Sequence, residues 1–357
     1  MADRPFDEGR SEAFAGRMMD VLNGAGVALM TSIGHQVGLF DAMAGLTPAT
    51  SAQVAAAAGL DKRYVREWLG AMVTGGVVEH DPADQTYALP PEHASWLTRA
   101  AGTDNLALQA QYVPLLAQVE GPIVECFRHG GGVPYAAFPR FQRLMAEESG
   151  AVHDAALVDA ILPLVPGLPA RLAAGLDVAD VGCGSGHAIN LMARAFPNSR
   201  FVGYDFSEEG GQVGRDEAAR LGLANARFEA RDVTDLGASE RFDLVTAFDA
   251  IHDQAQPARV LAGIAEALRL DGVFLMVDIG ASSHVHENLE FPMAPFMYTI
   301  SCMHCMTVSL ALGGTGLGAM WGEQTARKML AEAGFGRVEV KRIEDDLFNN
   351  YYVATKG

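Results

Sequence analysis

His252 and Asp253 are the neighbouring pair in this chain best suited to acid–base chemistry. They follow residues 242–248, an apolar run that alternates like a strand. An imidazole has an ordinary pKa of about 6.5, so it can accept a proton near neutrality when a carboxylate orients it. The candidate carboxylates are Asp253, Asp278 and Glu323. We expect His252 to be a general base; the alternative is a structural His–Asp pair that caps the next helix.

A glycine-rich turn lies upstream, where residues 180–186 read Asp-Val-Gly-Cys-Gly-Ser-Gly between an apolar run and a helical pattern. Glycine allows a tight turn and a close approach to a ligand, and the N-terminus of the next helix offers free N–H groups. His187 stands where a dinucleotide fingerprint would have its third glycine, so the turn does not fit that motif. We expect a nucleotide-like cofactor here, bound by Asp180, Gly182, Cys183, Gly184 and Gly186.

The rest of this half alternates strands with helices. A strand over 201–205 ends in Asp205, where a carboxylate suits ribose hydroxyls, and a strand over 226–230 leads into Asp232 and Val233. The later pattern predicts helices at 257–269 and 325–333, and strands at 272–278, 337–343 and 348–354. Alternation of this kind predicts a doubly wound α/β sheet.

The glycine turn followed by acids at the next two strand ends resembles the class I S-adenosylmethionine (SAM) methyltransferases. The resemblance covers about half of the chain, roughly residues 165–357. It implies a Rossmann-like, doubly wound seven-stranded sheet whose last strand pair is an antiparallel hairpin. It also implies SAM as cofactor and S-adenosylhomocysteine (SAH) as product, with Asp232 at the adenine amino group and Val233 on the ring. The further residues expected at the cofactor are Phe206, Phe248 and, on a Gly-rich bend, Tyr135.

The first hundred residues predict a winged helix. Helical patterns over 11–44, 51–58 and 62–74 precede a hairpin made of residues 77–80 and 86–89. A DNA-binding module would need a basic face, but residues 51–100 are net acidic, and so is the hairpin. We therefore expect no nucleic-acid partner and prefer a dimerisation or substrate-lid module.

The N-terminal half is also similar to that of small-molecule O-methyltransferases and of mycobacterial winged-helix methyltransferases. The phrases that carry this similarity are 33–36, 64–72 and 131–135. It implies a homodimer built through the winged-helix half. We expect a winged-helix or dimerisation domain over 1–100, a helical linker over 101–165 and a SAM-binding domain over 166–357.

The segment 280–322 concentrates His, Cys, Met and aromatic side chains, which suit an adaptable apolar pocket wall. Cys302 and Cys305, with His304 between them, also invite a zinc interpretation. Zinc sites usually draw four ligands from paired clusters, so we expect no metal and prefer a pocket wall. The glycines of 313–318 indicate a lid hinge. The residues expected to contact substrate are His35, His304, Met297 and Trp321.

Composition limits the function further. The net charge of −18 opposes nucleic acid and anionic lipid, no apolar run is long enough for a membrane span, and four cysteines do not make a disulfide framework. A charged N-terminus without an apolar core favours the cytoplasm. We expect a SAM-dependent methyltransferase acting on a small-molecule hydroxyl. The alternatives are S-methylation of a small thiol or thioether without a general base, and a SAM-sensing DNA-binding regulator.

Overall fold

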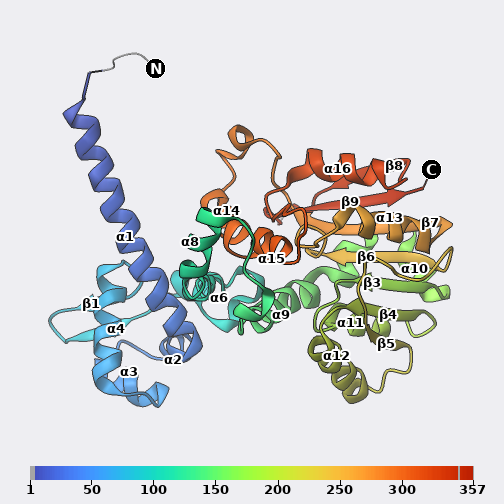
Figure 1. Ribbon diagram of the computed structural model, residues 1–357. Coiled ribbons are helices and arrows are strands. Elements are labelled where there is room, and N and C mark those ends of the chain that lie inside the picture. Colours follow the sequence, from blue (N-terminus) through green and yellow to red (C-terminus); the bar gives the residue numbers. More distant parts are fainter. Residues whose placement is uncertain (1–4, 345, 357) are drawn as a thin grey trace. The chain divides into compact units, whose positions relative to one another are not determined.

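The computed structural model describes residues 5–344 and 346–356. The chain forms two compact units, of which the first ends at Ala117 and the second begins at Gln118 (Figure 1). The segment 101–165, expected as a linker, therefore contributes to both units.

The first unit is a winged helix, as its sequence pattern predicts. Asp61 caps the second helix of the motif by accepting hydrogen bonds from the backbone N–H groups of Arg63 at 2.8 Å and Tyr64 at 3.3 Å. Strands β1 and β2 pair antiparallel to form the wing. The elements are α1 (Glu8–Gln36), α2 (Leu39–Ala44), α3 (Ser51–Ala58), α4 (Lys62–Thr74), β1 (Glu79–Asp81), β2 (Thr86–Ala88), α5 (Pro91–Leu97), α6 (Leu106–Gln109) and α7 (Tyr112–Ala117).

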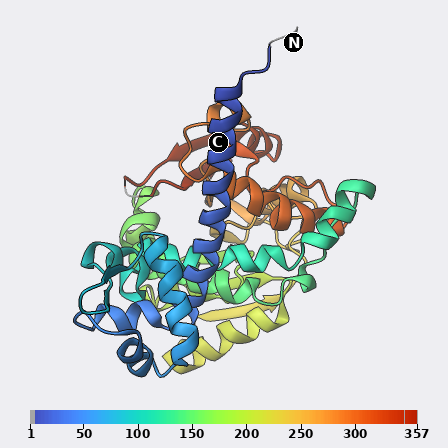
Figure 2. The same cartoon turned by 90° about the vertical axis from the view of Figure 1, so that its left-hand side faces the viewer.

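The helical pattern expected over 11–44 is divided into two helices, because the chain breaks between α1 and α2. Gly38, which precedes α2, has a φ of 73°, a left-handed conformation that ends the first helix. Trp68 on α4 packs edge-on against Phe40 and donates its indole N–H to the carbonyl of Met30 at 2.8 Å. Helix α1 is buried only near its C-terminal end, and Figure 2 shows its N-terminal part extending beyond α2–α4 of the same unit.

The second unit begins with helices that lead into a sheet. They are α8 (Glu120–His129), η2 (Tyr135–Ala137), α9 (Phe141–Val152), the π-helical η3 (His153–Ile161), η4 (Leu162–Leu164) and α10 (Leu168–Ala174). In the described ranges no single helix is long and apolar enough to cross a membrane. Only the pair Phe141–Leu164 and Leu168–Ala174, bent by 102°, meets the length and composition criteria together. Buried leucines of this pair, among them Leu157 and Leu168, belong to the core of the second unit.

The sheet has seven strands in the order β5-β4-β3-β6-β7-β9-β8. The first four pairings are parallel, and β9 runs antiparallel to both β7 and β8, so the predicted seven-stranded sheet with a terminal hairpin is confirmed. The strands are β3 (Asp177–Val181), β4 (Arg200–Asp205), β5 (Ala226–Ala230), β6 (Phe242–Phe248), β7 (Leu268–Ile279), β8 (Arg337–Lys341) and β9 (Asn349–Thr355).

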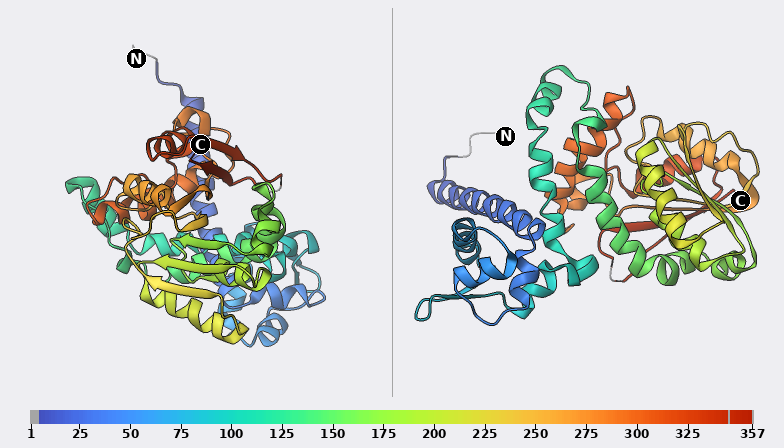
Figure 3. Two further views of the ribbon diagram at one scale, coloured as in Figure 1. Left: turned by 90° about the vertical axis from the view of Figure 1, so that its right-hand side faces the viewer. Right: turned by 90° about the horizontal axis from the view of Figure 1, so that it is seen from below.

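Helices cover both faces of this sheet (Figure 3). One core cluster joins the sheet to α13 (Pro257–Ala267) and α16 (Gly322–Glu332). The other joins it to α10 and η3 with α11 (His187–Ala195) and α12 (Glu208–Leu221). Because β3–β7 run parallel, their carboxyl ends meet at one edge of the sheet, where ligands bind in open α/β sheets.

The segment after β7 contributes η5 (Val285–Asn288), α14 (Ala294–Ile300), the π-helical η6 (Ser301–Cys305) and α15 (Met306–Ala311). Single π turns inside helices are frequent at functional sites. The π turn of η6 contains His304 and both cysteines of this segment.

Candidate functional site

The glycine turn connects β3 to α11. Gly182, Gly184 and Gly186 have φ values of 74°, 52° and 74°, a region that L-residues with a Cβ rarely occupy. Space is a second constraint: a Cβ on Gly182 would lie 2.4 Å from the Cβ of Ala250, and one on Gly186 would lie 2.2 Å from the ring of Phe228. Two of these positions therefore require glycine for both conformation and packing.

Asp205 lies at the end of β4 beside this turn. Its carboxylate accepts hydrogen bonds from the N–H of Gly184 at 2.9 Å and of Ser207 at 2.8 Å. Burial raises the pKa of Asp205. The acid and the glycine turn thus form one preformed structure before any ligand is present.

Asp180, at the start of the turn, is 2% exposed and accepts a hydrogen bond from the Thr246 hydroxyl at 2.6 Å. Burial, with a contribution from the charge of Asp205, raises its pKa to about 7. Cys183 lies on the same turn and is half-buried. Burial and nearby carboxylates raise the pKa of its thiol, which makes it a poor nucleophile.

The residues expected at the adenine have different surroundings. Asp232 is exposed, and the backbone N–H and hydroxyl of Thr234 donate to it at 2.9 and 2.8 Å, which lowers its pKa. Val233 is 6% exposed and belongs to the core cluster on the α13 face. Their adenine contacts stay predictions.

Aromatic rings gather beside the turn. The Tyr135 ring lies 5.4 Å from that of Phe206 and 5.2 Å from that of His304, edge-on in both pairs. Burial raises the pKa of Tyr135, and the charges of Asp253 and Asp205 raise it further. The structure therefore brings this tyrosine within electrostatic range of the expected ribose-binding acid. Phe248, at the end of β6, packs edge-on against His153 at 4.8 Å between centroids.

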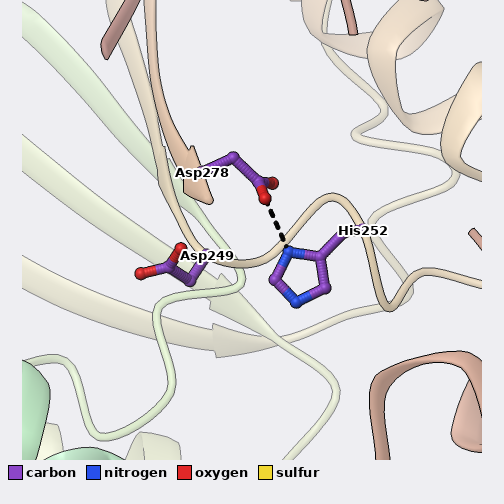
Figure 4. A group of neighbouring side chains, drawn as sticks. All are labelled: Asp249, His252 and Asp278. Carbon is purple, nitrogen blue, oxygen red and sulfur yellow. Dashed lines mark hydrogen bonds and ion pairs between the residues drawn. The ribbon is translucent and has the colours of Figure 1, made fainter. Parts of the chain in front are cut away.

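His252 follows β6 and is 5% exposed, and Figure 4 shows its ring facing the carboxylate of Asp278. Its Nδ1 lies 2.8 Å from Oδ1 of Asp278, at the end of β7. The same oxygen accepts hydrogen bonds from the Trp321 indole N–H at 3.0 Å and from the N–H of Ile279 at 2.9 Å. This network assigns the proton to Nδ1, leaving Nε2 as the atom that can accept a proton.

The electrostatics of His252 also fit a base. Burial lowers its pKa, but the Asp278 carboxylate more than offsets this and raises the pKa well above its ordinary value. The side chain of Cys305, which is 6% exposed, is a further hydrogen-bonding group beside the imidazole. The resulting pair is a strong proton acceptor, and because its pKa is raised, the imidazole must first release its own proton before it can act as a base.

Of the three candidate orienting carboxylates, the structure places Asp278 on the imidazole. Asp253 accepts a hydrogen bond from the Gln254 amide at 3.3 Å, and burial raises its pKa to about 6. Glu323 accepts from the Arg327 guanidinium at 2.7 Å and from the Asn350 amide at 3.4 Å. The sequence pattern could not rank these acids, because the contact with Asp278 depends on the register of β6 and β7.

Asp249 is a candidate that the sequence reasoning missed. It follows β6 directly, has a φ of 50°, and its backbone N–H donates to Val277 at 2.9 Å. Burial and the charge of Asp278 raise its pKa to about 8. Donor atoms of Asp249, His252 and Asp278 lie within 4.8 Å of one another. Residues of these types at this spacing could hold a metal ion. The sequence contained an indication of this residue, because an acid directly after a central strand is expected at this edge of the sheet.

His304 is 1% exposed and stacked on Phe141, with ring centroids 3.3 Å apart and planes 9° apart. Neither ring nitrogen has a hydrogen-bond partner within the described ranges. Burial, then the charge of His252, lowers its pKa to about 3, so the ring is neutral. In the described part of the chain, Cys302, His304 and Cys305 do not form a group of potential metal donors.

The other expected substrate contacts are dispersed. The indole N–H of Trp321 donates to Asp278 and so directly supports the His252–Asp278 pair. Met297 is half-buried on α14. His35 belongs to the first unit, where it is 3% exposed and its carbonyl accepts from the Arg99 guanidinium at 2.8 Å. In the expected hinge, the N–H of Gly318 donates to the carbonyl of His252 at 3.1 Å.

Comparisons with known proteins match both halves. Residues 25–99 match the Rv2258c-like winged HTH domain, and residues 172–334 match a methyltransferase domain. The malonyl-[acyl-carrier protein] O-methyltransferase of Bacillus cereus is 22% identical over 121 residues, which are 34% of this chain and 44% of that protein. The trans-aconitate 2-methyltransferase of Deinococcus radiodurans is 35% identical over 112 residues, 31% of this chain and 40% of that protein. The chain therefore spans less than half the length of these curated relatives.

Solved structures resemble the chain over nearly its whole length. The mitomycin 7-O-methyltransferase MmcR has a TM-score of 0.71 at 18% identity, covering 98% of this chain and 100% of that one. Human N-acetylserotonin methyltransferase, solved with SAM, has a TM-score of 0.68 at 16% identity, covering 100% of both chains. These likenesses establish the fold. Together with the domain matches they confirm the predicted winged helix followed by a class I methyltransferase fold.

Proposed function

Because the chain joins an Rv2258c-like winged HTH domain to a methyltransferase domain, we propose that it is a SAM-dependent methyltransferase that methylates a hydroxyl group of a small molecule. SAM as the donor is supported by the preformed glycine turn with Asp205, and by neighbours solved with SAM and with SAH. An O-methylation is supported by structural neighbours described as O-methyltransferases.

The observation that carries the proposal is the hydrogen bond between His252 and Asp278. Methyl transfer from a sulfonium is an in-line displacement: the acceptor oxygen forms a bond to the methyl carbon as the S–CH3 bond breaks. The acceptor must be held on this axis, about 3 Å from the methyl group. A neutral hydroxyl must also lose its proton, which Nε2 of His252 accepts while Asp278 stabilises the imidazolium.

The test uses methyl-labelled SAM. Purified protein is incubated with a small-molecule extract and, separately, with a protein and nucleic-acid extract. We expect label in small, extractable products only, and strongly reduced transfer by His252→Gln. His129→Ala, which removes an exposed histidine on α8, should transfer at the wild-type rate. Label confined to the macromolecular fraction would contradict the proposal.

A thiol or thioether acceptor is the second candidate. It is favoured by the methionine-rich wall of α14–α15 and by the thiol of Cys305 beside His252. Such an acceptor needs little or no proton removal. With this acceptor, the rate of methyl transfer by His252→Ala would fall tenfold or less. With a hydroxyl acceptor, the rate should fall about a hundredfold or more.

A SAM-sensing DNA-binding regulator is the rival from another class. In the described residues the exposed Arg63 of α4 is paired with Glu67, which reduces the positive charge that a recognition helix would offer. We therefore propose no nucleic-acid partner. All four cysteines are free, which supports a separate proposal of a cytoplasmic location. A gel shift at low salt with micromolar protein should show no complex.

We also propose that the protein acts as a homodimer through α1. Phe14, Met18, Val21 and Leu22 share one face of this helix and are 41–69% exposed. A face of this kind favours a second copy of the same helix. Light scattering should give a dimer for the wild type and a monomer for Leu22→Glu. The control Leu270→Glu, at another exposed leucine, should remain dimeric.

A further inference from the structure

Among the described carboxylates of the cofactor turn and the expected reacting centre, four have a hydrogen-bond donor. Asp180 is paired with Thr246, Asp205 with backbone N–H groups, Asp253 with Gln254 and Asp278 with His252. Oδ1 of Asp249 is buried and has no hydrogen-bond partner among the described residues. Leaving such a group unpaired is costly, so this oxygen indicates a ligand that the protein alone does not supply.

The position of Asp249 limits what that ligand can be. A Cβ added at Gly182 would contact Ala250, the residue that follows Asp249. Asp249 therefore adjoins the glycine turn. On its other side, its donor atom lies within 4.8 Å of the donor atoms of His252 and Asp278. Asp249 therefore adjoins both the cofactor-binding turn and the expected base.

The backbone of Asp249 supports a functional role. A non-glycine residue at a φ of 50° is strained, and such strain persists when the surroundings fix it. Here the hydrogen bond from its N–H to Val277 fixes it at the edge of β7. The strained turn directs the chain from β6 into the loop that holds His252.

We propose, on the basis of the methyltransferase function above, that Asp249 recognises the positive charge of the sulfonium of SAM and thereby distinguishes the donor from its product. SAM and SAH share the adenosine and the amino acid, and differ in the methyl group and in the sulfonium charge. An acid close to the reacting centre, rather than at the adenine, contacts the part in which they differ. Within the described residues no lysine or arginine is among the groups that set the pKa of Asp249, so no such cation already neutralises the carboxylate that a bound sulfonium would meet.

The charges that face Asp249 explain how the distinction would work. They are Asp278 on β7, His252 on the adjoining loop, Glu148 on α9 and Asp346 between β8 and β9. Three of the four are acids, and together with burial they raise the pKa of Asp249 to about 8, so it is protonated in the empty site at neutral pH. The positive charge of a bound sulfonium lowers the pKa of Asp249, which then releases its proton.

The proton balance closes over one turnover. Asp249 loses a proton to solvent when SAM binds. The S–CH3 bond then breaks, the acceptor oxygen gains the methyl group, and the acceptor proton moves to His252. Once the sulfur is an uncharged thioether, Asp249 takes a proton back and the product is held less tightly. His252 releases the acceptor proton to solvent, so one proton leaves for each methyl group transferred. Because this interaction stabilises the bound donor rather than the transition state, it affects SAM affinity more than kcat.

Calorimetric titrations of wild type and Asp249→Asn test this, with SAM or SAH and no acceptor, in two pH 7 buffers of different ionisation enthalpy. Asn is close in shape and tolerates a left-handed backbone, so the fold should survive. Wild type should release close to one proton per SAM and none per SAH. Asp249→Asn should release none, and its preference for SAM over SAH should fall about tenfold. Asp216→Asn, which removes an exposed carboxylate of α12, should behave as wild type.

Other results would overturn the inference. Equal proton release with SAM and SAH would assign Asp249 to a group that both share, such as the ammonium. Tight binding of Mg²⁺ or Mn²⁺ without SAM, lost in Asp249→Asn, would make the carboxylates a metal site. Failure of the wild type to bind SAM at all would refute the proposed function, whereas SAM binding without proton release would refute only the role of Asp249.

Discussion

The cofactor-binding turn and the reacting centre adjoin each other, yet their polar groups are satisfied in opposite ways. In the turn, the Asp205 carboxylate accepts from two backbone N–H groups and Asp180 from a hydroxyl. At the reacting centre, described atoms without hydrogen-bond partners include Oδ1 of Asp249, Oδ2 of Asp278 and both ring nitrogens of His304. The first region is complete without ligand, and the second has bonds still to make.

This difference reflects two tasks. A common cofactor can be bound by a rigid turn whose geometry glycine and backbone determine. Catalysis and acceptor recognition need groups that exchange protons and partners, so these groups are buried and held in place but left free at one atom. Changes in the turn should thus impair binding and stability, whereas changes at the reacting centre should impair rate, proton balance or acceptor affinity.

The largest expected effect follows from Asp278→Asn. Asn cannot stabilise the imidazolium and can favour the wrong tautomer of His252, so kcat/KM should fall roughly 100-fold to 10,000-fold. The pKa of His252 should also fall toward its ordinary value, so the rate, which rises as His252 loses its proton, should rise at lower pH than in the wild type. The pH–rate profile measures both effects. Asp253→Asn is the matched control, and equal losses in the two variants would refute the assignment of Asp278.

Next in size is Gly186→Ala. The added Cβ would lie 2.2 Å from the Phe228 ring at a φ of 74°, so SAM affinity should fall at least tenfold and the protein should unfold more easily. Gly184→Ala is the control for backbone strain alone, because its Cβ meets nothing within 4 Å at a φ of 52°. Its cost should be smaller, about 1 kcal/mol. Titration calorimetry and thermal unfolding distinguish the two, and equal effects would contradict the packing argument.

His304→Phe tests the acceptor side. Phenylalanine preserves the stack on Phe141 but has no nitrogen, so KM for the acceptor should rise about tenfold while SAM affinity stays unchanged. His304→Gln, which restores hydrogen bonding, should recover part of the loss. An unchanged KM in both variants would reduce His304 to a packing residue.

The smallest effect concerns stability. The pKa values of Asp180, Asp249 and Asp253 are raised to about 7, 8 and 6, so the folded protein binds more protons than the unfolded chain. Their contribution is therefore lost as pH rises from about 4, the ordinary pKa of an aspartate, to 8, and between pH 6 and 8 the melting temperature without ligand should still fall by a few degrees. SAM should raise the melting temperature more at pH 8 than at pH 6. A melting temperature that rises with pH would contradict these ionisation states.

The sequence predicts the turn better than the reacting centre for a physical reason. Glycine spacing and strand ends are local properties, so positions such as Gly182 and Asp205 can be assigned from the order of residues. The choice of Asp278 over Asp253 depends on pairing between β6 and β7, and the orphaned state of Asp249 depends on what surrounds it. The break at Gly38 was missed because the apolar periodicity continues through it while the backbone does not.

The most direct test of the central claim uses SAM carrying a ¹³C-methyl group. The protein is supplied with a small-molecule extract, and NMR then identifies the atom that carries the label. We expect a methyl group on oxygen in a small product, formed far more slowly by Asp278→Asn and His252→Gln. A methyl group on sulfur that forms at nearly the wild-type rate in both variants would contradict His252–Asp278 as the base.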